Sequence, residues 1–325
     1  MTKQASRRLI LAGVVLAVIA AAIAVLRTSY SQVPTVAIVN YVTYPILDES
    51  IRGIKAELAD RGFKADNIRI IEVNANGQTE LLNTIVQEIL SKRPSVIVPV
   101  STPVARAIVK AAGAKQPIVF STVTNPQDVG MSDHPANVTG VSDVVNYSAN
   151  VELIQQLFPS AKKIGHIYNP GEANSQFGVE ETRKIAASRN LELVLATVAG
   201  SAEVVDAARI LAQKVDVFYV GSDNTVAAAI NGLLSVANEH RIPVIASDSG
   251  SVEQGALAGV SVNYFRVGRE VGRIVAQVLD TKAQPGTIPN VLFRGDELIL
   301  NEPAAKKISY EFPDVVRRRA KRILP

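Results

Sequence analysis

The chain has 325 residues, 47% of them hydrophobic, which suits about two globular domains with sizeable cores. It contains no cysteine, which excludes disulfides, thiolate metal sites, cysteine nucleophiles and a lipid-modified N-terminal cysteine. The net charge of +4 comes from the two ends, because residues 1–30 carry +4 and residues 306–325 carry +5; the remaining body is mildly acidic, which argues against a nucleic-acid partner.

The N-terminal segment is apolar enough to enter a membrane. Leu9–Leu26 contains no charged residue and is flanked by Arg8 and Arg27. As a helix it would span about 27 Å, close to the thickness of a bilayer core. More positive charge precedes the segment than follows it, which places the body outside the cytoplasm. The sequence therefore predicts an exported, periplasmic protein in which residues 1–32 are either a cleaved signal peptide or a retained anchor that tethers it to the inner membrane.

Strands and helices are predicted to alternate in the first half of the body. Short apolar runs indicate strands, and apolar residues three and four positions apart indicate helices. In chain order the predicted elements are a strand at Thr35–Asn40, a helix at Asp48–Asp60, a strand at Asn67–Val73, a helix at Gln78–Leu90, a strand at Ser95–Val100, a helix at Val104–Ala112, and strands at Pro117–Thr122 and Asn137–Val141. This alternation predicts a parallel sheet covered on both faces.

A second series repeats the same order. Its predicted elements are a helix at Glu152–Phe158, a strand at Lys163–Tyr168, a helix at Ser175–Arg189, a strand at Glu192–Val198, a helix at Ala202–Leu211, a strand at Val215–Val220, a helix at Val226–Asn238 and a strand at Pro243–Ala246. The segments Val96–Thr124 and Val217–Gly250 are the most alike, since each reads as strand, polar cluster, helix and strand. Two similar units predict two similar lobes.

The last part of the chain is too short for a third domain. It contains apolar runs at Ala256–Val262 and Val291–Leu300 and a helix at Arg266–Leu279. We expect the chain to return to the first lobe and then to the second, with crossovers near residues 142, 250 and 285. The first lobe would comprise residues 33–142 and 250–284, the second residues 143–249 and 285–312, and residues 313–325 would be a basic tail. The predicted fold is α/β, with two doubly wound parallel-sheet lobes joined by a multi-stranded hinge and preceded by one apolar helix.

Polar side chains follow the predicted strands, and parallel folds bind ligands at the carboxyl ends of their strands. The candidate ligand-binding residues are Tyr41, Thr43, Ser101, Thr102, Thr122, Thr124, Asn169, Asn174, Asp223, Asn224 and Asp248. Free backbone N–H groups at the helix start after Ser101 favour a carboxylate, and Asp248 can pair with an ammonium. Helix capping or turn formation explains most of these residues equally well.

Signatures of catalysis are missing from the sequence. No G-x-G-x-x-G follows the first strand, and neither a P-loop nor a G-x-S-x-G elbow occurs. His134, His166 and His240 are scattered and share no spacing typical of metal ligands. We therefore expect no enzymatic activity, no catalytic residue, no metal and no cofactor.

Several runs in the right order resemble one family. They are IVNYVTYPILDESIRGIKAELADRGF, IVFSTVTNP, NVTGVSD, IYNPGEANS, SDNTV and PVIASD. Over about residues 34–300 the chain resembles ABC-transporter substrate-binding proteins with the type I periplasmic-binding fold, in the group that includes tryptophan- and tyrosine-binding proteins. The resemblance implies a monomeric Venus-flytrap that closes on a small molecule and delivers it to an ABC permease in the inner membrane. It also implies that Ser101, Thr122 and Thr124 contact the α-amino and carboxylate groups of an amino acid.

The two lobes differ in the residues that end their strands. The first presents hydroxyls at Ser101 and Thr122, and the second presents acids at Asp223 and Asp248. One lobe would then bind a carboxylate and the other an ammonium, which favours an amino acid, with an aromatic one among the candidates, as the ligand of an importer. The alternative function is a membrane-tethered sensing receptor that is not coupled to transport.

Overall fold

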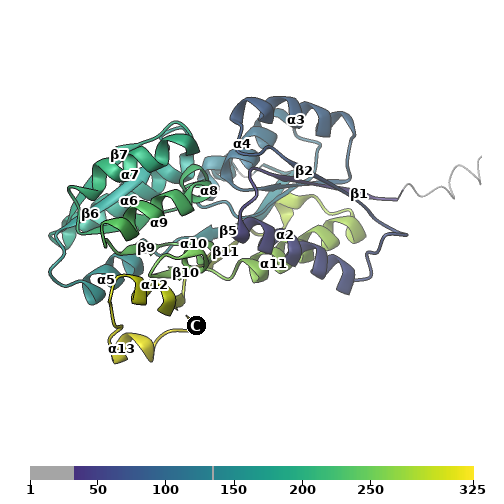
Figure 1. Ribbon diagram of the computed structural model, residues 1–325. Coiled ribbons are helices and arrows are strands. Elements are labelled where there is room, and N and C mark those ends of the chain that lie inside the picture. Colours follow the sequence, from purple (N-terminus) through teal and green to yellow (C-terminus); the bar gives the residue numbers. More distant parts are fainter. Residues whose placement is uncertain (1–32, 134) are drawn as a thin grey trace, which may run out of the picture. The chain divides into compact units, whose positions relative to one another are not determined.

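The strands of the chain form two separate sheets in a computed structural model that describes residues 33–133 and 135–325 (Figure 1). We call the part built on the six-stranded sheet lobe 1 and the part built on the seven-stranded sheet lobe 2. The apolar helix expected at Leu9–Leu26 lies outside the described residues. Within them, no helix combines the length and apolarity that crossing a membrane requires.

Lobe 1 has the strand order β11-β5-β4-β3-β1-β2, and all its strands are parallel. The strands are β1 (Thr35–Asn40), β2 (Arg69–Asn74), β3 (Val96–Val100), β4 (Ile118–Phe120), β5 (Val138–Val144) and β11 (Val291–Arg294). Helices α3 (Thr79–Ser91) and α4 (Thr102–Ala111) lie on one side of β1 and β2, and α2 (Pro45–Asp60) and α11 (Tyr264–Thr281) lie on the other (Figure 1). Because helices cover both faces, β3 and β4 are buried along their whole length.

Lobe 2 has the strand order β13-β12-β10-β9-β8-β6-β7, with only β10 and β12 antiparallel among its described neighbours. The strands are β6 (Lys163–Tyr168), β7 (Glu192–Thr197), β8 (Val217–Val220), β9 (Val244–Ala246), β10 (Ala258–Ser261), β12 (Glu297–Asn301) and β13 (Arg322–Leu324). The helices are α5 (Tyr147–Leu157), α6 (Ala173–Ser188), α7 (Val204–Ala212), α8 (Asn224–Ala228), α9 (Ile230–Glu239), α10 (Ser249–Gln254), α12 (Glu302–Lys307) and α13 (Asp314–Arg317).

The chain passes between the lobes three times, after β5, after β10 and after β11. The second and third passages come later than the expected positions near residues 250 and 285. The second is later because β10 pairs with β9 and β12 and therefore stays in lobe 2. The third is later because β11 pairs with β5 of lobe 1. The expected strand Val291–Leu300 is in fact two strands, one in each lobe, separated at Gly295 and Asp296.

The last residues of the chain are an integral part of lobe 2, although residues 313–325 were expected to form a tail. β13 pairs in parallel with β12 and forms the edge of the sheet. Phe312 and Val316 are both buried and pack in the same hydrophobic cluster as Leu298 and Leu300. Apolar side chains placed between the basic residues therefore hold this segment against the lobe.

Candidate functional site

The carboxyl ends of the strands of both lobes line two cavities. The inner cavity lies next to the passages between the lobes, with Asp143, Val145 and Tyr264 in its wall, and has a volume of about 30 Å³. The outer chamber, of about 960 Å³, lies beyond Pro103 of α4 and Ala173 of α6. One water molecule occupies about 30 Å³ in the liquid, so the inner cavity has room for about one water molecule. The lobes are therefore closed tightly over it.

Most of the residues expected to bind a ligand lie around the inner cavity. Those that line it are Ser101, Thr102, Thr122, Thr124, Asn174, Asp223, Asn224 and Asp248. Tyr41 and Asn169 line the outer chamber instead. Thr43 lines neither, and its hydroxyl oxygen accepts a hydrogen bond from the Asn74 side chain at 3.0 Å.

Ser101 and Thr122 have strained backbones at the ends of β3 and β4. Their φ angles are 84° and 52°, a region that side-chain-bearing residues rarely adopt. The strain is compensated in part by the Ser101 N–H group, which donates to the carbonyl oxygen of Ser121 and to Thr122 Oγ1, at 3.0 and 3.1 Å. Ser101 occupies the N-cap position of α4, but its side chain makes no capping hydrogen bond, and its buried Oγ has no partner. The capping explanation therefore does not account for this serine side chain.

The acids Asp223 and Asp248 do cap helices. Asp248 Oδ1 accepts hydrogen bonds from the Ser251 N–H group and the Tyr44 hydroxyl, both at 2.8 Å, and its Oδ2 accepts from Ser251 Oγ at 2.7 Å. Asp223 accepts from the N–H groups of Val226 and Asn169. Burial raises the pKa of both carboxyl groups. Each oxygen of these two carboxylates thus already accepts at least one hydrogen bond within the protein.

Glu172 is a buried acid that the sequence analysis did not single out. Its carboxylate accepts hydrogen bonds from the backbone N–H groups of Asn224 and Thr225 and from the Asn174 side chain. It therefore fixes the start of α8 and the position of Asn174, whose Oδ1 is buried and has no partner. In the sequence, only the position of this acid in the polar loop between β6 and α6 indicated that it lies near the site.

Asp143 is the second acid that the sequence analysis missed. It lies near the end of β5 in the wall of the inner cavity, only 4% exposed. Its Oδ2 accepts a hydrogen bond from the Tyr264 hydroxyl at 3.2 Å, while its Oδ1 is buried without a partner. Burial raises the pKa of Asp143 to about 7. The expected strand ended at Val141, whereas β5 continues to Val144 and turns Asp143 to the same face as Val141.

Three buried oxygen atoms of the inner cavity thus have no hydrogen-bond partner: Ser101 Oγ, Asp143 Oδ1 and Asn174 Oδ1. Buried polar atoms in proteins are nearly always partnered by protein, water or ligand, so these three mark the inner cavity as a place where a bound molecule can be held. Ile46, Leu47 and Val145 provide an apolar part of the same wall. This arrangement suits a small molecule that has polar groups at one end and apolar surface at the other.

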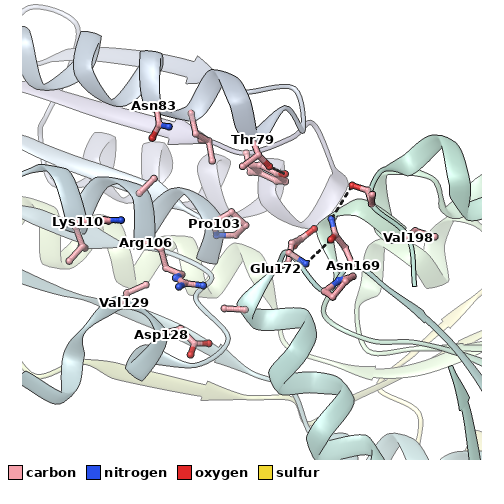
Figure 2. A pocket seen from close by; sticks show the side chains of 18 of the residues that line it. Thr79, Asn83, Pro103, Arg106, Lys110, Asp128, Val129, Asn169, Glu172 and Val198 are labelled. Carbon is pink, nitrogen blue, oxygen red and sulfur yellow. Dashed lines mark hydrogen bonds between the residues drawn. The ribbon is translucent and has the colours of Figure 1, made fainter. Parts of the chain in front are cut away.

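The outer chamber is much larger but chemically less specific. Figure 2 shows Arg106 and Lys110 on one side and Asn169, Glu172 and Val198 on the other. Arg106 and Lys110 are exposed to solvent, and Glu172 is already fully hydrogen-bonded. Its volume is in the range of small-molecule sites, but the three unpartnered buried atoms lie in the inner cavity and not here.

The chain is similar in sequence and in fold to several known proteins. The sequence is 34% identical over 290 residues to the tyrosine-binding protein of Clostridioides difficile, covering 88% of this chain and 84% of that protein. The fold is similar to a Streptococcus pneumoniae ABC domain solved in complex with L-Trp, with a TM-score of 0.86, 28% identity, and 90% and 99% of the two chains covered.

A ligand-free, open structure of a Clostridium difficile substrate-binding protein with adhesive properties is less similar in arrangement. Its TM-score is 0.66 at 31% identity, with 90% of this chain and 99% of that chain covered. Residues 35–324 match the family described as ABC transporter substrate binding protein. The chain therefore belongs to the ABC transporter substrate-binding protein family.

Proposed function

We propose that the protein is the extracytoplasmic receptor of an ABC importer and that it binds an aromatic amino acid in the inner cavity. The observation that carries this proposal is the convergence of Ser101 Oγ, Asp143 Oδ1 and Asn174 Oδ1 in one buried space between the lobes. The names of the tyrosine-binding relative and of the L-Trp complex support the same class of ligand. A permease in the inner membrane would receive the ligand from the monomeric receptor.

Each end of an amino acid has a suitable partner in this cavity. The ligand carboxylate would lie at the N-terminus of α4, where Ser101 Oγ is free and the helix dipole favours negative charge. The ligand ammonium would donate to Asp143 Oδ1 and Asn174 Oδ1. This assignment differs from the expected one, because the acid with an unpartnered oxygen, Asp143, lies in strand β5 of lobe 1, while Asp223 and Asp248 of lobe 2 serve as caps.

The aromatic ring would occupy the apolar part of the wall. Ile46 and Leu47 of α2 approach it from lobe 1 and Ala227 of α8 approaches it from lobe 2. The inner cavity is smaller than an aromatic amino acid, so the lobes must move apart to admit one. We therefore expect a hinge motion at the three passages between the lobes, which closes again around the ligand.

Calorimetric titration with tyrosine, tryptophan and phenylalanine tests this function, with a sugar and a dicarboxylate as negative probes. Ser101→Ala should weaken binding of the amino acid by about ten-fold, the usual effect of one hydrogen bond to a charged group, with little change in melting temperature. Ser142→Ala is the matched control, because Ser142 Oγ is also buried without a partner but lies outside both cavities. Failure of all three amino acids to bind would refute the ligand class.

A further inference from the structure

Tyr44 connects the two lobes through a single buried hydroxyl group. It precedes α2 in lobe 1 and is 4% exposed. Its hydroxyl donates to Asp248 Oδ1 at 2.8 Å and lies 2.7 Å from Ser251 Oγ, and both of these residues belong to the start of α10 in lobe 2. This hydrogen bond joins the two lobes directly in the arrangement described here.

The surroundings of this contact are complementary on both sides. Gly250 at the start of α10 lies against Pro45 and Ile46, so that a β-carbon there would stand 3.2 to 3.3 Å from their side chains. Asp248 is held in place by the Ser251 N–H and Oγ groups and therefore presents Oδ1 to Tyr44 in a fixed direction. Thr124 Oγ1 and Ser222 Oγ, 2.8 Å apart, make a second contact between the lobes on another side of the inner cavity.

We propose that Tyr44 is a positioning residue that sets ligand affinity by holding the lobes closed through Asp248 and Ser251. The inference rests on the proposed function for its consequence, since closure matters for affinity only in a receptor. Because the inner cavity of the closed arrangement is smaller than an aromatic amino acid, a bond that favours this arrangement raises the free energy needed to open the lobes and admit one. The ligand-free protein should consequently spend a measurable fraction of its time closed.

The chain offers a close control for this residue. Tyr41 also follows β1, is 3% exposed, and its hydroxyl lies 3.1 Å from Thr79 Oγ1 and donates to the Gly77 carbonyl oxygen at 3.3 Å. Both partners of Tyr41 belong to lobe 1, as Tyr41 itself does. Tyr41→Phe and Tyr44→Phe thus remove the same atom from similar surroundings, and only the second removes a bond between lobes.

Spin labels measure the closure without any ligand. The absence of native cysteine allows one label at Lys110→Cys in lobe 1 and one at Ser201→Cys in lobe 2, both exposed positions. The experiment uses residues 35–325, which form a compact unit that the L-Trp-bound relative matches over 99% of its own chain. Pulsed electron paramagnetic resonance should show a closed population that falls in Tyr44→Phe by about ten-fold relative to the open one and stays unchanged in Tyr41→Phe.

Ser251→Ala, which removes the second partner of Tyr44, should lower the closed population as well. Equal distance distributions in Tyr44→Phe and the parent protein would overturn the proposal, as would an equal shift in Tyr41→Phe. Circular dichroism checks that each variant is folded. Because these distances are measured without ligand, they remain informative even if tyrosine, tryptophan and phenylalanine fail to bind.

Discussion

At the scale of single residues, polar side chains at the strand ends fall into two groups that look alike in the sequence. Asp223 and Asp248 accept hydrogen bonds from backbone N–H groups three residues later and thereby cap α8 and α10. Ser101 stands at the same kind of position, yet its side chain caps nothing and faces the cavity. Capping depends on side-chain torsions and on the approach of the strand, which residue type alone does not specify.

Asp143 gives the proposed site a testable dependence on pH. Burial raises the pKa of its carboxyl group to about 7, and a neighbouring ligand ammonium would lower that pKa again. Binding at pH 6 should therefore release a proton, and affinity should increase from pH 5 to about pH 7 and then level off. Calorimetry in two buffers of different ionisation enthalpy measures the released proton directly.

Asp143→Asn should abolish this proton release and bind the amino acid more weakly at pH 8. The same substitution should affect stability with a defined sign. Because the raised pKa makes the folded protein bind the extra proton, Asp143 makes the parent protein lose stability as pH rises from about 4 to 7. Asp143→Asn should show a smaller loss, and the part that remains comes from Asp223, whose pKa burial also raises to about 7. Asp206→Asn, at an exposed acid, is the control. If the affinity for the amino acid depended on pH in Asp143→Asn as it does in the parent protein, this acid would be ruled out as the ammonium partner.

At the scale of elements, the contact between α2 and α11 depends on glycines that the sequence analysis did not interpret. The two helices pack together on one face of the lobe 1 sheet. A β-carbon on Gly268 would overlap the Ser50 carbonyl oxygen, and one on Gly53 would overlap the Phe265 carbonyl oxygen. The helix backbones are therefore in direct contact, which explains how α11 can join lobe 1 although it is far from α2 in the sequence.

Gly268→Ala should destabilise the protein more than an ordinary small-to-large change, which costs about 1–3 kcal/mol, because backbone atoms would have to move. The control is Gly178→Ala in α6, where the nearest atom to a new β-carbon is the Tyr147 hydroxyl oxygen at 3.1 Å, at the far end of a side chain. Both changes raise helix propensity equally. Urea unfolding should rank Gly268→Ala well below Gly178→Ala, and the reverse order would contradict the close packing.

The elements that the sequence predicted well are those with strong periodic patterns. The two series of alternating strands and helices, from β1 to β5 and from α5 to β9, lie close to the expected ranges, except that the single helix expected at Val226–Asn238 is two helices, α8 and α9. The passages between the lobes were misplaced because they depend on strand pairing between distant segments. Val291–Leu300 reads as one apolar run, and only its pairing partners, β5 for one half and β10 for the other, divide it at Gly295. The ends of strands, where Asp143 lies, were the least predictable for the same reason.

At the scale of the whole body, residues 35–325, the two lobes share more than a ligand site. One hydrophobic cluster contains Leu47 of lobe 1 together with Ala227 and Val252 of lobe 2. The chain also crosses between the sheets three times, so neither lobe is a continuous segment. Unfolding of one lobe would expose apolar surface of the other and release its crossing segments. We therefore expect the lobes to unfold cooperatively.

Calorimetric scanning of residues 35–325 should consequently show a single transition, with equal calorimetric and van't Hoff enthalpies. Tyrosine at one hundred times its dissociation constant should stabilise the folded state by about 2.7 kcal/mol and move that transition as a whole. Gly268→Ala should lower the same single transition although the glycine lies in lobe 1. The opposite outcome would be two resolved transitions, both shifted by the ligand but only one shifted by Gly268→Ala. The interface between the lobes would then contribute little to stability. The bonds made by Tyr44 and Thr124 would join the lobes without coupling the unfolding of the two cores.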